Sequence, residues 1–171
     1  KTMIGGQVPS AELDEVGIVG DRTWTGRDDT TGAIANARKL GRLMRLAARS
    51  GDDGSVTITL PDGRSVSSTD PAVNDVLSAE LGRAVSLWQR PPAEQVDFFR
   101  RAPFTGDDVM AELRGIFARD ETEPLPDFSK FPAVSIEYET PPGAFYDCSP
   151  LLIMTTSALR SMAAAVPESI V

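Results

Sequence analysis

A short glycine-rich segment near the start of the chain carries the side chain best suited to binding an anion. Residues 17–24 read Gly-Ile-Val-Gly-Asp-Arg-Thr-Trp, so Arg22 follows directly on a turn that Gly20 favours. The guanidinium group of arginine is a fork of hydrogen-bond donors that matches a phosphate or a carboxylate. The same residues also fit an ordinary turn into a strand, in which Asp21 and Arg22 form a surface ion pair and Trp24 enters the core.

Two other segments carry side chains that suit the same kind of ligand. Lys1 and Thr2 offer an ammonium group and a hydroxyl group, although a lysine near a terminus is usually only solvated. Thr155, Thr156 and Ser157 stand where an apolar segment gives way to a helical pattern. A helix start presents unpaired N–H groups and the positive end of the helix dipole, so these hydroxyls predict an anion site. Ordinary N-capping by Thr or Ser explains the same residues without a ligand.

The chain contains no histidine and a single cysteine, Cys148. Catalysis by Ser-His-Asp or Cys-His groups is therefore excluded within these residues, and so is an ordinary histidine-based zinc site. One cysteine cannot form an internal disulfide, which fits a reducing compartment, and we predict a cytoplasmic protein. We interpret Cys148 as a small side chain that is buried or half-buried.

The charge of the chain disfavours two classes of partner. The 25 acidic and 17 basic side chains give a net charge of −8. Binding to nucleic acid or to an anionic membrane surface relies on an excess of Lys and Arg, so neither partner is expected. A local basic pocket remains compatible with this balance. The sequence shows no run of about 18 apolar residues and no signal-peptide pattern.

Most of the expected elements are short strands joined by turns. Residues 23–38 have the pattern of a hairpin around a polar turn. Residues 56–67 alternate cleanly on both sides of a Pro-Asp-Gly turn, which predicts a second hairpin. Residues 84–88 predict a further strand.

Two stretches carry helical signals in the first half of the chain. Residues 70–82 predict a helix with Asp70 as its N-cap and Gly82 at its end. Residues 40–49 fit either one helical face or a short bend followed by a strand, and we favour the strand. These elements are interpreted as scaffold.

The second half is less regular. The pattern predicts a helix over 109–117, capped by residues 105–108, and then a long irregular connection over 120–132 whose phenylalanines dock on the protein. Residues 151–154 are uniformly apolar and predict a buried strand. A helix with an apolar stripe follows from residue 155 to residue 166.

Three of these segments, in this order, resemble motifs of the MOSC superfamily, which is named for the C-terminal domain of molybdenum cofactor sulfurase. In that family a strand with the pattern V-K-S/T-x-x-G precedes G-L-x-G-D-R-x-W. Much later, F-x-D-x-x-P leads through an apolar run and hydroxyl residues into a helix. Residues 1–6, 17–24 and 145–159 carry the corresponding sequences, whereas the middle of the chain matches only in character.

The resemblance implies a mainly β fold with short helices, in the α+β class, built on a MOSC-like β-barrel. It also implies a single MOSC-type domain over residues 1–171. Because both ends look clipped relative to the family, we expect this chain to hold the N-terminal and central part of the domain and an incomplete barrel. The family's C-terminal part would be absent.

The resemblance also implies a cofactor and its site. MOSC proteins similar to the amidoxime-reducing components hold a molybdenum cofactor (molybdopterin), and their site residues correspond to Lys1, Thr2 and Arg22. The strand-to-helix junction adds three hydroxyl residues, Thr155, Thr156 and Ser157. No residue is assigned as catalytic or as a metal ligand.

The chain departs from the family where the metal should be held. The family has an R-F-R-P-N segment after the last helix seen here and, later still, a cysteine whose thiolate ligates molybdenum. Cys148 precedes the apolar segment and is not that cysteine. We therefore expect either a fragment or a degenerate member.

The resemblance leads to a protein that binds the molybdenum cofactor and acts as a small-molecule oxidoreductase, with N-hydroxylated compounds as substrates, or as a sulfur-transfer protein. An electron-transfer or sulfur-donor protein would be its partner. The alternative is a non-catalytic module that binds a cofactor or a sulfur carrier on the same scaffold. A third interpretation is an interaction module in which these residues are structural.

Overall fold

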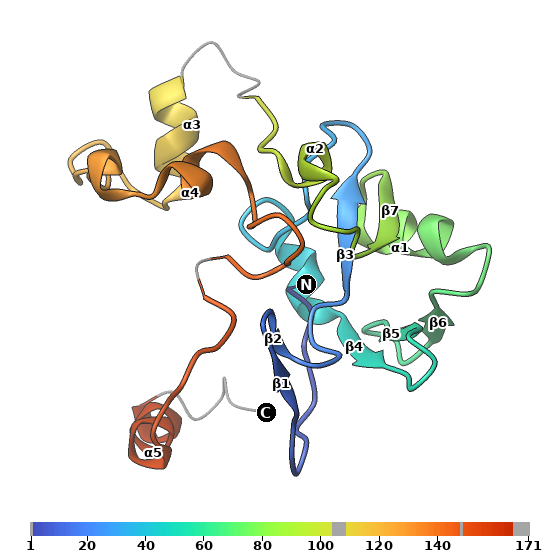
Figure 1. Cartoon of the computed structure of the whole chain (residues 1–171). Coiled ribbons are helices and arrows are strands. Elements are labelled where there is room, and N and C mark those ends of the chain that lie inside the picture. Colours follow the sequence, from blue (N-terminus) through green and yellow to red (C-terminus); the bar gives the residue numbers. More distant parts are fainter. Residues whose placement is uncertain (1, 104–108, 148, 166–171) are drawn as a thin grey trace.

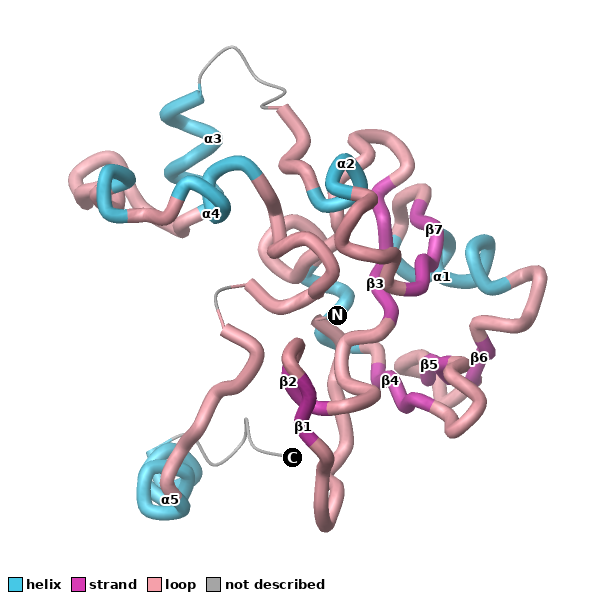
Figure 2. The backbone as a smooth tube through the Cα atoms, viewed as in Figure 1, coloured by secondary structure: helices cyan, strands magenta, loops and turns pink. Residues whose placement is uncertain are grey.

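The computed structural model describes residues 2–103, 109–147 and 149–165. Short strands and short helices follow one another along the chain (Figure 1), and loops make up much of its length (Figure 2). The presence of both strands and helices confirms the expected α+β class, but strands do not predominate among the described residues, so the fold is not mainly β. The predictions for Lys1, for residues 105–108 as a helix cap and for Cys148 lie outside the described residues.

The described strands pair in three separate antiparallel sheets. The first holds β1 and β2, the second holds β3 and β7, and the third has the order β4-β5-β6. Their bounds are Leu13–Asp14 (β1), Gly17–Ile18 (β2), Trp24–Asp28 (β3), Ala47–Ser50 (β4), Val56–Thr59 (β5), Ser65–Ser67 (β6) and Val85–Gln89 (β7). None of these sheets closes into a barrel within the described ranges.

The segments with the clearest sequence patterns form the elements predicted for them. Strands β5 and β6 pair with Ile58 opposite Val66, and both side chains are buried, as the alternation requires. In the segment 23–38, β3 is followed by a turn, and Ala33 and Ala35 exchange backbone hydrogen bonds with β3. The hairpin predicted over residues 23–38 is therefore confirmed, with a short second arm that pairs with β3. The strand that pairs with β3 over its whole length is β7, from much later in the chain.

The helix predicted over 70–82 is α1, which spans Val73–Leu81 and ends at Gly82 with φ 68°. Its start differs from the prediction, because Asp70 does not cap the helix. The Asp70 carboxylate instead accepts the Ala72 N–H at 2.8 Å and forms a turn before the helix. One apolar face of α1 packs into the main core, which also takes side chains from β5, β6 and β7.

The ambiguous stretch 40–49 forms a short bend followed by a strand. A short 3₁₀ helix, η1, covers Gly41–Arg45, and β4 follows directly. Leu43 and Leu46 are buried in the main core, whereas Met44 is 62% exposed. The bend followed by a strand is therefore confirmed, and the full helical face is not formed.

The second half of the chain is organised around an aromatic cluster. Helix α2 (Val96–Phe99) places Phe98 and Phe99 against Phe145, with ring centroids 6.2 Å and 5.9 Å apart, and Ile34 joins them from the first half. The expected helix is α3 (Val109–Ile116). Two short helices follow it, η2 (Phe128–Lys130) and α4 (Ala133–Glu137). The ring centroids of Phe128 and Phe117 lie 5.7 Å apart, which confirms that the irregular connection packs against the protein.

The predicted buried strand over 151–154 is wrong. The structure has no strand there, and Leu152 and Ile153 are 85% and 88% exposed. A uniform apolar run records side-chain type but not whether another segment covers it, and no described strand edge pairs with it. The following helix, α5 (Thr156–Ala165), is formed as expected, but it lies apart from β3 and β4, and none of its described residues is buried (Figure 1).

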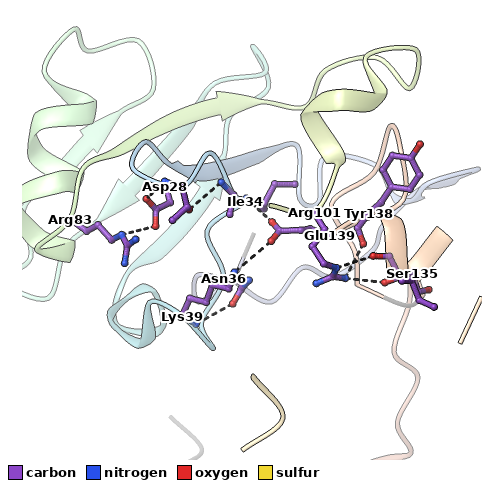
Figure 3. A network of polar contacts seen from close by, with 12 residues as sticks. Asp28, Ile34, Asn36, Lys39, Arg83, Arg101, Ser135, Tyr138 and Glu139 are labelled. Atoms are coloured by element: carbon purple, nitrogen blue, oxygen red, sulfur yellow. Dashed lines mark hydrogen bonds and ion pairs between the residues drawn. The ribbon is translucent and has the colours of Figure 1, made fainter. Parts of the chain in front are cut away.

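Polar contacts tie the second half of the chain to the first (Figure 3). The Glu139 side chain is only 6% exposed, accepts the Ile34 N–H at 2.7 Å and lies 3.9 Å from the ammonium group of Lys39. Arg101 donates to the carbonyl groups of Ser135, Ile136 and Tyr138, and so holds the end of α4. The contacts of Glu139 fix the segment around residue 139 against the loop that follows β3, and those of Arg101 join residue 101 to the end of α4.

Candidate functional site

A pocket of about 300 Å³ lies where the N-terminal segment meets the start of β3. Thr2 and Arg22, two of the residues singled out in the sequence, both line it. Twenty positions separate them, so neither the N-terminal segment nor the glycine-rich turn forms the pocket alone. Strand β4 explains how the two segments meet, because each of them is attached to it.

The N-terminal segment is attached to β4 by backbone hydrogen bonds. Ile4 donates to the Leu46 carbonyl and accepts from the Ala48 N–H, both at 2.8 Å, in a parallel bridge to Ala47. Met3, next to it, is half-buried against the main core. Thr2 is therefore held beside β4 by the two residues that follow it.

The glycine-rich turn is attached to the other end of the same strand. The Ser50 hydroxyl donates to the Gly20 carbonyl at 2.8 Å. Gly20 has φ 82° and open space where a side chain would start, as a tight turn facing a cavity requires. Sequence reasoning missed Ser50, because a serine that bonds a carbonyl thirty positions away leaves no local pattern.

Both candidate residues have strained backbone. Thr2 has φ 70° and Arg22 has φ 49°, and the one other described non-glycine residue with positive φ is Ala118. This region is costly for any side chain with a Cβ, and most of all for a β-branched threonine. Strain of this kind persists where the surrounding structure enforces it, and it gathers at functional sites.

Among the described residues, the side chain of Arg22 makes one exposed ion pair. Its Nε atom lies 3.0 Å from the carboxylate of Asp21, and the two side chains are 37% and 40% exposed. The predicted surface ion pair is therefore present. An ion pair this exposed contributes about 0–1 kcal/mol, so an anionic ligand can replace Asp21 at little cost.

Trp24 forms part of the pocket wall as well as packing against the core. Its indole N–H donates to the Gly54 carbonyl at 3.0 Å, which ties the start of β3 to the turn between β4 and β5. In that turn, hydrogen bonds from the hydroxyl and the N–H of Ser55 lower the pKa of Asp53. The turn that holds the indole is thus itself fixed by local hydrogen bonds.

The three hydroxyl residues at the start of α5 lie elsewhere. Thr155, Thr156 and Ser157 are exposed and do not line the pocket that contains Thr2 and Arg22. The Thr155 hydroxyl accepts the Ala158 N–H at 3.1 Å, which is ordinary N-capping. The structure therefore gathers two of the candidate residues and leaves these three apart, and their role in anion binding stays a prediction.

The described residues contain no group of three or more His, Cys, Asp or Glu side chains that could hold a metal ion. The donors at the pocket are instead a guanidinium group, hydroxyl groups and backbone. Such donors suit the oxygen atoms of a phosphate rather than a transition metal. Across the same described ranges, no helix is long and apolar enough to cross a membrane.

A comparison with known protein families finds a match to this part of the molecule. The family model described as the MOSC N-terminal beta barrel domain matches residues 1–90, more than half of the 171 residues. No curated protein and no solved structure gives a significant match. The matched region contains every described residue that lines the pocket. The chain therefore belongs to the MOSC family, through its N-terminal beta barrel domain.

Proposed function

We propose that this protein binds a molybdopterin-type cofactor in the pocket lined by Thr2 and Arg22. The observation that carries the proposal is the convergence of these two residues, from separate segments and both with left-handed backbone, on one polar pocket. Lys1 is placed at the same site by resemblance to the family alone. The hydroxyl group of Thr2 and the guanidinium group of Arg22 are hydrogen-bond donors that fit the phosphate group of such a cofactor.

In this proposal each residue of the pocket has a limited role. Arg22 exchanges its exposed partner Asp21 for the cofactor's phosphate, and the Thr2 hydroxyl donates a further hydrogen bond. Ser50 positions the turn that carries Arg22 through its bond to Gly20. The cofactor, when bound, would supply the redox or sulfur-transfer chemistry, while these residues hold and orient it.

The overall activity follows the same proposal. The protein would act as a small-molecule oxidoreductase or a sulfur-transfer protein, with a reducible N-hydroxylated or sulfur-bearing compound as substrate. An electron-transfer or sulfur-donor protein would be its partner. Support comes from membership of the MOSC family and from a pocket suited to a phosphate-bearing ligand.

The position of the two tryptophans gives a direct test of binding. Trp24 lines the pocket, whereas Trp88 lies outside it and packs against Phe98. In a Trp88→Phe variant, titration with a pterin phosphate should quench the Trp24 fluorescence in a saturable way. Excess inorganic phosphate should reverse part of the quenching, because it competes for Arg22.

A Trp24→Phe variant, which keeps Trp88, gives the background caused by light absorption and collisions. Quenching of equal size in both variants, without saturation, would remove the support for this pocket. Saturable quenching by a pterin, in a protein that carries no metal and turns over no substrate, would favour the non-catalytic binding module.

A further inference from the structure

A second pocket, of about 520 Å³, lies at the other end of β3. Its wall includes Asp28, the last residue of β3, and Thr31 from the turn that follows. The first pocket borders Trp24 and Thr25, at the start of the same strand. The two pockets share no lining residue, so the second is a separate feature of the fold.

Three cations face this second pocket. They are Arg38 and Lys39 from the loop after β3, and Arg83 from the end of α1. Figure 3 shows Arg83 beside Asp28, and Lys39 on the loop that follows β3. Two carboxylates, Asp28 and Glu112, also line the pocket, so the described residues of its wall carry three positive and two negative groups in a chain of net charge −8.

The nearer carboxylate is already used by the fold. One oxygen of Asp28 accepts the N–H groups of Thr30 and Thr31 at 2.9 Å and 3.2 Å, and the other lies 2.6 Å from the Nε of Arg83. The Asp28 side chain is only 7% exposed. It therefore orients Arg83 but has little capacity left to neutralise the neighbouring cations.

Within the described part of the chain, hydrogen bonds and ion pairs occupy few of the N–H donors of these cations. The Nε–H of Arg83 is not aligned with any acceptor, despite the short distance to Asp28. Lys39 reaches its partner Glu139 only at 3.9 Å. Arg38 is exposed, and no acidic side chain of the described residues lies within 4.0 Å of it. Guanidinium and ammonium groups gathered in this way attract anionic oxygen atoms.

The other described residues of the wall are mostly apolar and leave space for a ligand. Ala102, Pro103 and Ile116 line it, and a side chain added at Gly115 would meet nothing within 4 Å. The volume falls in the range of about 300–1,000 Å³ that is typical of small-molecule sites. A ligand with an anionic group and a short apolar part would satisfy both kinds of surface.

From this combination we propose that the second pocket binds a small molecule carrying two or more anionic oxygen atoms, through Arg38, Lys39 and Arg83. Phosphate and carboxylate groups both meet this description. The site is independent of the cofactor proposal, because it uses none of the residues of the first pocket.

Inorganic pyrophosphate is a suitable probe, measured by isothermal titration calorimetry at about 0.15 M salt, where long-range attraction is screened. An Arg22→Gln background removes the main anion-binding group of the first pocket. In that background, Arg38→Gln should weaken pyrophosphate binding by about tenfold to a hundredfold, as expected for a lost hydrogen bond to a charged group. Arg38 makes no ion pair with the described residues, so thermal stability should stay unchanged.

Arg64→Gln is the matched control, since it removes the same charge at the β5–β6 turn, where Arg64 pairs with Asp62. Its affinity for pyrophosphate should equal that of the background. Equal weakening by Arg38→Gln and Arg64→Gln would show a general charge effect and would overturn the proposal. Absence of binding in the Arg22→Gln background would also overturn it, whatever the first pocket binds.

Discussion

Replacing Arg22 with alanine is expected to weaken the affinity for molybdopterin by about tenfold to a hundredfold, as expected when a hydrogen bond to a charged group is removed, and so to lower the pterin that stays with the purified chain. Arg22 lines the first pocket, and its ion pair with the described residues is the exposed contact with Asp21, at 3.0 Å. Its guanidinium group is therefore available to an anion. The pterin content of purified protein, released by oxidation and measured by fluorescence, is the readout.

Stability and binding can be separated at this position. Arg22 has φ 49°, a conformation that glycine adopts without strain, so Arg22→Gly should lose pterin while keeping the thermal midpoint close to that of the parent. Arg64→Ala removes the same charge outside the pocket and should keep its pterin. If Arg22→Ala and Arg22→Gly both retain the full pterin content, Arg22 has no part in binding.

Replacing Glu139 with alanine is expected to lower the free energy of unfolding by about 1–3 kcal/mol, because a buried N–H group loses its acceptor. The Glu139 side chain is 6% exposed and accepts the Ile34 N–H at 2.7 Å, and Ile34 itself is 2% exposed. Equilibrium unfolding in urea measures the effect, and hydrogen exchange at the Ile34 amide should become faster.

Glu139→Gln is the matched control for this prediction. Glutamine keeps a carbonyl oxygen for the Ile34 N–H but loses the charge facing Lys39. That ion pair spans 3.9 Å and Lys39 is 40% exposed, so the change should cost less than about 1 kcal/mol. Equal stability of Glu139→Ala and the parent would mean that residue 139 does not join the two halves of the chain in solution.

The elements that could be predicted from the sequence are those whose signal is local. The β5–β6 hairpin follows from alternation around one turn, and the end of α1 follows from Gly82. The pairing of β3 with β7 has no such signal, because Trp24 and its partner Gln89 lie far apart in the sequence. Burial is equally non-local, which is why the apolar segment 151–154 was assigned wrongly to the core.

The candidate site shows the same division. Arg22 was found because a glycine-rich turn precedes it, and Thr2 was found through the resemblance of its segment to the MOSC motif; the structure brings both to one pocket. Ser50 could not be found, since it acts through a hydrogen bond to a distant carbonyl. The second pocket was missed because Arg38, Lys39 and Arg83 are ordinary surface charges until the fold gathers them.

The proposed binding of a molybdopterin-type cofactor to this MOSC protein is tested most directly by the content of pterin per chain. The measurement uses protein purified from a host that makes the cofactor, with circular dichroism to show that the chain is folded. Close to one pterin per chain, lost in Arg22→Ala and kept in Arg64→Ala, is the predicted result. Folded protein from the same host that contains no pterin would contradict the proposal.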